Sequence, residues 1–370
     1  MILQDTRRLV IKVGSALLID DTSHKIKNNW IETLCADIAD LKRDGVEIVI
    51  VSSGAIGAGR SVLKLGTKTL RLEEKQAAAA AGQIRLTNIW QENFIAHEIV
   101  LAQILLTPSD TEQRRRHLNA RNTIETLLGL GSIPIINEND TVTTEEIRFG
   151  DNDRLAARVA QMIAADTLIL LSDIDGLYTA DPRKDPTAEF IDEVSEITED
   201  IKNMASEAAP GNSSGGMVTK LAAAEIATRA GCQVIIADGR PKHSLGRLGL
   251  DGRFTRFIAI ESSSNARKRW IAGAVSHAGV LTIDEGAVKA LRTGGSLLPA
   301  GINHVEGSFE RGDTVVVSDL KGKRLGCGIC AYSATDARMI AGRKSGDIEG
   351  LLGYQGRDEI IHRDDLVLED

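Results

Sequence analysis

Six short apolar runs, each about as long as a β-strand, recur along the first 240 residues of the chain. The runs cover residues 8–14, 47–54, 99–106, 132–137, 167–173 and 232–238. Most of their positions are apolar, instead of every second one. Such near-continuous runs are typical of strands whose two faces are both buried.

Segments of helical character lie between these runs. One predicted helix covers residues 28–45, where the apolar side chains fall on one face: Trp30, Ile31, Leu34, Cys35, Ile38 and Leu41. Residues 151–166 and 219–231 are also helical in character, and the second segment ends at Gly231, a natural helix stop. Alternating strands and helices predict an α/β fold with a mostly parallel central sheet between two helical layers. Active sites of such sheets lie at the carboxyl ends of the strands.

The pattern changes near residue 270. Residues 262–270, SSSNARKRW, are polar and basic and suit a linker or domain edge. Short, turn-rich apolar runs follow at 279–284, 313–319 and 326–333, which predicts a small β-rich domain of about 90 residues. We therefore expect one domain over residues 1–265 and a second over residues 275–370.

Composition and charge narrow the class of protein. The chain has 370 residues, 42% of them hydrophobic and 26% charged, with a net charge of -8, which suits a soluble globular protein and disfavours a nucleic-acid or anionic-membrane surface. No apolar run approaches the roughly 20 residues of a membrane span. The N-terminal residues do not read as a signal peptide, and four cysteines do not make a disulfide framework, so we expect a cytoplasmic protein. Cys327 and Cys330 form a lone C-x-x-C, for which ordinary packing stands beside a metal or redox role.

An unusual number of acids follows the fourth apolar run. Between Asn137 and Asp153 the chain has six acidic residues and one arginine. These side chains would gather at the carboxyl end of a buried strand. There they could neutralise a substrate ammonium group through charge-assisted hydrogen bonds.

Two glycine-rich turns could bind anions. The first, SSGAIGAGR, contains Gly54, Gly57 and Gly59 in the order G-x-x-G-x-G, which is not the dinucleotide fingerprint, and the chain has no P-loop sequence. Its N–H groups, with the hydroxyls of Ser52 and Ser53, could hold an anion at a helix N-terminus. A plain strand-to-helix turn is the alternative.

The second turn, GNSSGGMVTK, runs into a helix that has Lys220 in its first turn. A lysine there opposes the helix dipole unless an anion such as phosphate is bound, although a solvated surface lysine remains possible.

Lys12 lies inside the first apolar run and would point into the same crevice, unless it snorkels from an edge strand. Ser172 and Asp173 end another run, and the turn-rich residues 176–183 could line a pocket for a base and ribose or merely connect two elements. Together these features favour phosphoryl transfer from a nucleotide to a small charged acceptor.

The chain resembles the glutamate 5-kinase family of the amino acid kinase superfamily over almost its whole length. The matching stretches are VIKVGS, VIVSSGAIGAGR, LNARNT, IPIINENDTV, GDND, GLYTADPR, GGMVTK and RKRWIAG. The last portion, from GVLTIDEGA to HRDD, resembles a PUA domain. The resemblance implies the three-layer amino acid kinase fold and the Mg²⁺-dependent reaction of ATP with L-glutamate that gives ADP and L-glutamyl 5-phosphate, the first step of proline biosynthesis.

The resemblance also implies roles for individual residues. Lys12 and Lys220 would contact the ATP phosphates, and Asp153 would hold both lysines in place. Glutamate would be bound by Ser53, Gly54, Asn137, Asp140, Asp151 and Asn152. ATP would be bound by Lys12, Ser172, Asp173 and the loop of Ser214, Gly215, Gly216, Met217, Val218, Thr219 and Lys220. No protein metal site is expected, because phosphates and water supply most Mg²⁺ ligands.

Regulation and partners follow from the same resemblance. L-Proline would inhibit, although Arg148 and Phe149 depart from the family pattern and leave the strength of inhibition open. We expect a homo-oligomer of unspecified size, and contact with glutamyl phosphate reductase, since an acyl phosphate is reactive. Two alternatives stay open: a kinase for acetylglutamate or aspartate, and an RNA-binding factor acting through the PUA domain. Residues 271–370 hold 11 Lys and Arg against 15 Asp and Glu, and this net of -4 disfavours an extensive RNA-binding face.

Overall fold

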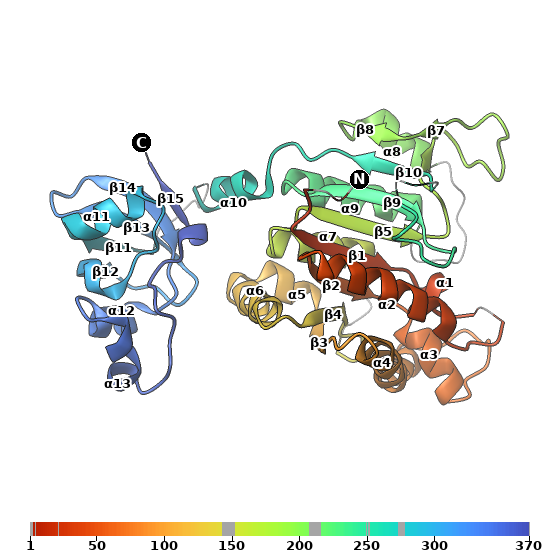
Figure 1. The fold of residues 1–370 in the computed structure, drawn as a ribbon, viewed down its shortest axis with the longest axis horizontal. Helices are drawn as coiled ribbons and strands as arrows, with labels where there is room; N and C mark the ends of the chain where they lie inside the picture. The colour runs from red at the N-terminus through yellow and green to blue at the C-terminus, as the bar shows by residue number, and fades with distance from the viewer. Residues whose placement is uncertain are drawn as a thin grey trace. The chain divides into compact units, whose positions relative to one another are not determined.

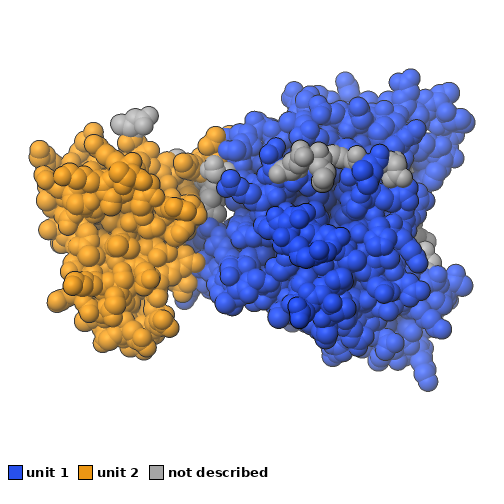
Figure 2. All heavy atoms as spheres, in the orientation of Figure 1, with its two compact units in different colours: residues 1–263 blue, residues 264–370 orange. Residues whose placement is uncertain are grey.

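The computed structural model of this chain describes residues 3, 5–20, 22–142, 152–206, 216–248, 250, 252–272 and 278–369. The chain divides into two compact units, Met1–Ser263 and Ser264–Asp370 (Figures 1 and 2). Each unit has its own sheet and its own hydrophobic core.

An eight-stranded sheet forms the centre of the first unit (Figure 1). From one edge to the other, its strands are β3 (Leu101–Leu106), β4 (Ile133–Glu138), β2 (Glu47–Ser52), β1 (Arg8–Val13), β5 (Thr167–Ser172), β9 (Gln233–Asp238), β10 (Phe254–Phe257) and β8 (Glu193–Val194). The first six pair in parallel, and β10 runs antiparallel to β9. All six strands predicted from the apolar runs are present, and the predicted parallel sheet is confirmed.

Helices cover both faces of this sheet, because alternate side chains of each strand point to opposite sides. Leu9 and Ile11 of β1 belong to one core cluster and Val10 belongs to the other. The helices that contribute to the Leu9 cluster are α1 (Ser15–Leu18), α2 (Asn28–Arg43), α3 (Ala55–Val62) and α4 (Leu72–Ile95). Those that contribute to the Val10 cluster are α6 (Arg114–Gly129), α7 (Asn152–Met162), α8 (Glu199–Ser206) and α9 (Met217–Arg229). The short α5 (Pro108–Glu112) precedes α6, and β6 (Leu177–Tyr178) pairs with β7 (Phe190–Ile191) as a separate ribbon.

The strand register brings the carboxyl ends of the central strands to one edge. Val13, the last residue of β1, pairs with Ser52 on one side and Leu171 on the other. Ser172 then pairs with Asp238 at the end of β9. Because β1 lies between β2 and β5, Lys12 does not lie on an edge strand, and that alternative is wrong.

Two glycines bring α3 and α4 into direct backbone contact. A Cβ at Gly59 would lie 1.8 Å from the carbonyl oxygen of Ala78, and one at Gly82 would lie 1.9 Å from that of Ala55. Any side chain at either position would separate the helices. This contact fixes α4 against the turn that follows β2, where Gly54, the N-cap residue of α3, has a left-handed conformation with φ of 95°.

The second unit is built on a five-stranded, mostly antiparallel sheet, as the turn-rich pattern predicts. Its strands, in order, are β12 (Ile302–Gly307), β11 (Gly279–Ile283), β13 (Thr314–Asp319), β14 (Arg324–Ile329) and β15 (Leu366–Leu368). Its shorter elements are α11 (Glu285–Arg292), α12 (Ala334–Ile340), α13 (Ile348–Leu352) and the 3₁₀ turns Pro299–Gly301, Ser345–Asp347 and Arg363–Asp365. Cys327 and Cys330 are free thiols buried in this unit. The boundary between the two units, Ser263/Ser264, falls within residues 262–270, so the predicted domain edge is confirmed, although α10 (Ser263–Ala272) makes most of the segment helical.

Candidate active site

A single carboxylate at the carboxyl edge of the sheet joins two lysines from distant parts of the chain. Asp153, the second residue of α7, binds the ammonium group of Lys12 through Oδ1. Its Oδ2 lies 3.0 Å from Lys220 Nζ. Thr219 Oγ1, which donates to the Gly216 carbonyl at 2.7 Å, also lies 3.2 Å from the same oxygen. Lys12 reaches this point from β1, and Lys220 reaches it from the first turns of α9.

All three charged side chains are buried. Asp153 is 0% exposed, Lys12 5% and Lys220 4%. Burial by itself would raise the pKa of Asp153, but the two ammonium groups outweigh it and hold the pKa below its ordinary value. Two cations against one anion leave a formal surplus of one positive charge in a site with little access to water. Such a surplus attracts a polyanion more strongly than it would in bulk solvent.

Helix N-termini add to this positive potential. Asp153 and Lys220 lie in the first turns of α7 and α9, so the positive ends of both helix dipoles are directed to this end of the site. α3 begins at the end of β2, beside Ser53, whose N–H donates to the carbonyl of Val13 at 3.1 Å. The site therefore resembles other anion sites at helix N-termini, with two lysine side chains added.

A network of side-chain amides lies beside the lysine pair. Asn152 Nδ2 lies 2.9 Å from each of three acceptors, which share its two hydrogens: the carbonyl of Ser52, the hydroxyl of Ser53 and Oδ1 of Asn137. Asn137, at the end of β4, is only 3% exposed, and its own amide nitrogen donates to Gln83 Oε1 on α4 at 2.7 Å. The structure thus brings together residues predicted from three separate sequence motifs. Gln83 was not among the predicted site residues.

The ends of β5 and β9 form a second polar region. Ser172 Oγ donates to Asp173 Oδ1 at 3.1 Å, and the Gly239 N–H donates to the Ser172 carbonyl at 2.8 Å. Arg240 forms a two-point ion pair with Asp238, at 2.9 Å and 2.8 Å.

An aromatic side chain lies near this region. Tyr178 donates its hydroxyl hydrogen to Asp175 at 3.0 Å. Burial, together with this hydrogen bond, raises the pKa of Tyr178. Tyr178 lies in a loop predicted from sequence as a possible lining for a base and ribose, whereas Asp238 and Arg240 were not among the predicted site residues.

Further predicted site residues lie beyond the end of β4, at the start of α9 or outside the described residues. Asp140 lies two residues beyond β4 and is half-buried, while Met217 and Val218 begin α9, with Gly216 at its N-cap. Val218 is 52% exposed, so its side chain points away from the buried lysines. Asp151, Ser214 and Gly215 lie outside the described residues, as do Arg148 and Phe149.

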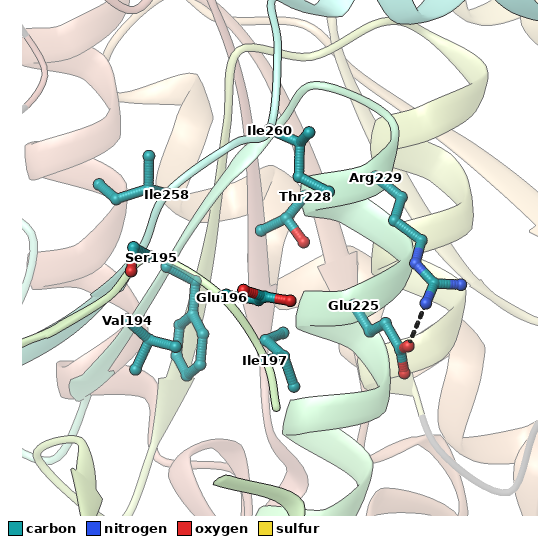
Figure 3. A pocket seen from close by; sticks show the side chains of 10 residues that line it. Val194, Ser195, Glu196, Ile197, Glu225, Thr228, Arg229, Ile258 and Ile260 are labelled. Carbon is teal, nitrogen blue, oxygen red and sulfur yellow. Dashed lines mark hydrogen bonds and ion pairs between the residues drawn. The ribbon is translucent and has the colours of Figure 1, made fainter. Parts of the chain in front are cut away.

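A pocket elsewhere in the first unit is separate from this site (Figure 3). Its lining includes Val194, Ile197, Phe257 and the C-terminal half of α9, where Glu225 and Arg229 form an ion pair of 2.6 Å. Glu225, the lining residue of α9 nearest to Lys220 in sequence, is five positions away, about 7.5 Å along the helix, and the lining includes none of Lys12, Asp153 and Lys220. The pocket therefore has no contact with the lysine pair.

Neither a metal cage nor a membrane span is found in the described part of the chain. Within those residues, no three His, Cys, Asp or Glu side chains converge in a way that could hold a metal ion. Every helix there is too short or too polar to cross a bilayer. Since both oxygens of Asp153 are engaged by lysines, a divalent cation at this site would need ligands from a bound substrate.

Comparison with known sequences assigns both units. Residues 7–238 match the family model described as the amino acid kinase family, and residues 279–352 match the PUA domain model. Over 363 residues the chain is 58% identical to a glutamate 5-kinase of Paramagnetospirillum magneticum, covering 98% of each chain. It is 56% identical over 366 residues to glutamate 5-kinase 1 of Rhizobium meliloti, covering 99% of this chain and 93% of the relative.

Among solved structures, the carbamate kinase from Giardia lamblia bound to AMP-PNP matches with a TM-score of 0.50 at 18% identity. The match covers 69% of this chain and 99% of the carbamate kinase chain. This likeness concerns the fold, and it agrees with the three-layer architecture of the first unit.

Proposed function

The chain belongs to the amino acid kinase family and, within it, to the glutamate 5-kinases, and from this we propose that it transfers the γ-phosphoryl group of ATP to L-glutamate. The products are ADP and L-glutamyl 5-phosphate, and the reaction is the first step of proline biosynthesis. The observation that best supports this proposal is the buried pair of lysines held on Asp153 at the carboxyl edge of the sheet. That arrangement suits a reaction between two anions.

The chemistry needs no general base. A γ-carboxylate has an ordinary pKa of about 4.3 and is already ionised at neutral pH. One of its oxygens forms a bond to the γ-phosphorus of ATP, while the bond from that phosphorus to the β,γ-bridging oxygen breaks and its electron pair leaves with ADP. Asp153, whose oxygens are both occupied, acts as an organiser of the lysines and not as a proton acceptor.

The barrier in this reaction is largely electrostatic. Two unit negative charges held 4 Å apart repel by about 4 kcal/mol at an effective dielectric of 20. Lys12 and Lys220 offset this repulsion and bind the phosphoryl oxygens more strongly as charge spreads over them in the transition state. Because both ammonium groups are already fixed by Asp153, little reorganisation accompanies the reaction.

Mg²⁺ fits this site as an ion that arrives on the nucleotide. When bound, it supplies charge neutralisation at the β- and γ-phosphates, and phosphates and water provide most of its ligands.

The amide network supports glutamate as the acceptor. Asn152 and Ser53 are positioned by hydrogen bonds beside the lysines, and Asp140 lies on the same edge. In our proposal the Asp140 carboxylate neutralises the ammonium group of the substrate. N-Acetylglutamate has no ammonium group and gains nothing from that charge, which argues against an acetylglutamate kinase.

The decisive experiment is a hydroxamate assay of the purified chain with Mg-ATP. We expect acyl phosphate from L-glutamate and little from N-acetyl-L-glutamate or L-aspartate. An equal rate with either of the latter two acceptors would contradict the proposed substrate. We further propose that L-proline inhibits by competing at or near the glutamate site, and a rate unaffected by L-proline would reject that part.

The remaining proposals concern the setting of the enzyme. We propose a cytoplasmic homo-oligomer that contacts glutamyl phosphate reductase, because a reactive acyl phosphate is best passed on before water hydrolyses it. Sedimentation of the chain with and without the reductase tests both the oligomer and the contact.

A further inference from the structure

Gln83 reaches the proposed glutamate site from α4, although the reaction as described gives it no role. Its Oε1 accepts a hydrogen bond from Asn137 Nδ2 at 2.7 Å. Asn137 Oδ1 in turn accepts from Asn152 Nδ2 at 2.9 Å. Three side-chain amides, on α4, β4 and α7, therefore form one relay that ends beside Ser53.

Backbone groups fix the direction of this relay. The N–H of Glu138, which can only donate, binds Asn137 Oδ1 at 2.9 Å, and the carbonyl of Ser52, which can only accept, binds Asn152 Nδ2 at 2.9 Å. Each asparagine amide thus has one orientation. Asn137 Nδ2 must then find an acceptor in an environment where the side chain is 3% exposed, and Gln83 provides it.

The side-chain oxygen of Asn152, Oδ1, takes no part in the relay. Its amide nitrogen faces Ser52, Ser53 and Asn137, so its Oδ1 points to the opposite side. In the described part of the chain, no side chain or backbone group donates to that oxygen. A carboxamide oxygen so placed can accept a hydrogen bond from a substrate ammonium group.

The helix that carries Gln83 has little freedom to shift. Gly82 precedes it, and a Cβ there would lie 1.9 Å from the carbonyl oxygen of Ala55 and 2.4 Å from the amide nitrogen of Gly59. α4 is therefore in backbone contact with α3, the helix that begins next to Ser53. This contact fixes the distance between Gln83 on α4 and Asn137 on β4.

We propose that Gln83 is a positioning residue that, through Asn137, orients Asn152 toward the ammonium group of the amino acid substrate. This inference rests on the proposed function. It assigns Gln83 an effect on glutamate affinity and none on the nucleotide.

The test compares three variants in the hydroxamate assay. Gln83→Met keeps the length of the side chain but removes the acceptor, and it is expected to raise the glutamate KM about fivefold to twentyfold, as expected when a buried N–H loses its partner. The ATP KM should stay close to that of the wild type, and the melting temperature should fall by only a few degrees, because one buried N–H loses its partner. Gln83→Glu keeps an acceptor at the same place and should restore a glutamate KM within about threefold of the wild type. Thr87→Val is the control, since it removes only the contact of Gln83 Nε2 with Thr87 Oγ1, 3.2 Å long and on the far side from Asn137.

A double variant with Asn137→Ala tests the route of the effect. If Gln83 acts through Asn137, Gln83→Met adds little to the loss caused by Asn137→Ala. An unchanged glutamate KM in Gln83→Met, equal rises in both KM values, or additive effects would each overturn the inference. If Gln83→Met does not fold, a glutamate KM in Gln83→Glu that rises more than threefold has the same consequence. Failure of the wild type to form acyl phosphate from L-glutamate would instead refute the proposed function.

Discussion

Lys220 Nζ lies 3.0 Å from Asp153 Oδ2, in a position where neither side chain is more than 4% exposed. The other oxygen of the same carboxylate binds Lys12. One buried anion therefore holds two cations that come from opposite ends of the first unit's sequence. Without it, the two ammonium groups would repel each other in a medium of low dielectric.

Replacing Lys220 by alanine should lower kcat much more than it raises the glutamate KM. The ammonium group is proposed to bind charge that develops in the transition state, and loss of one such group typically costs 10²–10³-fold in kcat. Steady-state kinetics with varied L-glutamate and ATP measure both constants. Lys202→Ala is a matched control, because Lys202 also contacts α9, through Glu225 at 3.5 Å, but lies at the surface. A Lys220→Ala variant with normal kcat and a raised glutamate KM would reject the role.

Replacing Asp153 by asparagine should destabilise the first unit. The change leaves two buried ammonium groups without their anion, and breaking a buried ion pair by removing one partner typically costs about 3–5 kcal/mol. The urea midpoint at pH 7 should therefore fall clearly below that of the wild type. The Lys202→Ala variant, which loses two solvent-accessible ion pairs, with Glu199 and Glu225, each worth at most about 1 kcal/mol, serves as the reference.

The difference in stability between the wild type and the Asp153→Asn variant should depend on pH. Because the pKa of Asp153 is lower in the folded state than its ordinary value, the unfolded chain binds the extra proton first as the pH falls. The stabilisation by the ionised Asp153 carboxylate is fully present above the pKa of the unfolded chain, about 3.9. It is lost as the pH falls toward the lower pKa of the folded state. Urea midpoints of the wild type and Asp153→Asn should differ by a constant amount from pH 7 to about pH 5 and converge below about pH 4. A gap that closes between pH 7 and pH 5 would show that another group is responsible.

Much of this architecture follows from sequence because its determinants are local. The six parallel strands are near-continuous apolar runs, Lys12 is conspicuous as a charge inside one of them, and Lys220 follows a glycine-rich turn at the start of a helix, while the role of Asp153 follows from the family resemblance. Parallel pairing then places strand ends at one edge without further information. The residues of the lysine pair could therefore be named before the structure was known.

Other features depend on contacts that no local pattern encodes. α4 is rich in alanine and has no clear apolar stripe, so its 24 residues gave no helical signal of the usual kind. Gln83 is recognisable only once β4 and α4 are adjacent, because its partner Asn137 is 54 positions away. The polar segment 262–270 marks the domain edge correctly, but its polarity gives no sign of a helix, although arginine, lysine and alanine are good helix formers and α10 forms there.

Asp140→Asn should chiefly weaken glutamate binding. The substitution keeps the shape of the side chain and removes the charge proposed to face the substrate ammonium. The loss of one charge-assisted hydrogen bond, worth about 1.5–3 kcal/mol, corresponds to a rise of roughly tenfold to a hundredfold in the glutamate KM. The same assay with varied ATP supplies the comparison, since the ATP KM should remain near its original value. An unchanged glutamate KM would remove Asp140 from the site.

The glycine contact between α3 and α4 predicts an effect opposite to that of helix propensity. In an exposed helix, glycine to alanine stabilises by about 1 kcal/mol. At Gly82 the new Cβ would lie 1.9 Å from the carbonyl oxygen of Ala55, which belongs to a rigid backbone, so the helices must separate. Overpacking of this kind typically destabilises by about 1–3 kcal/mol, and we expect Gly82→Ala to melt at a lower temperature and to bind L-glutamate more weakly.

Gly129→Ala offers the matched comparison for that variant. Gly129 is the last residue of α6, and a Cβ added there meets no atom within 4 Å. This variant should keep its melting temperature or raise it slightly, because only the entropy of the unfolded chain changes. If Gly82→Ala behaved like Gly129→Ala in melting and in glutamate KM, the backbone contact would not set the position of α4. The relay from Gln83 to Asn152 would then have to tolerate a shift of α4.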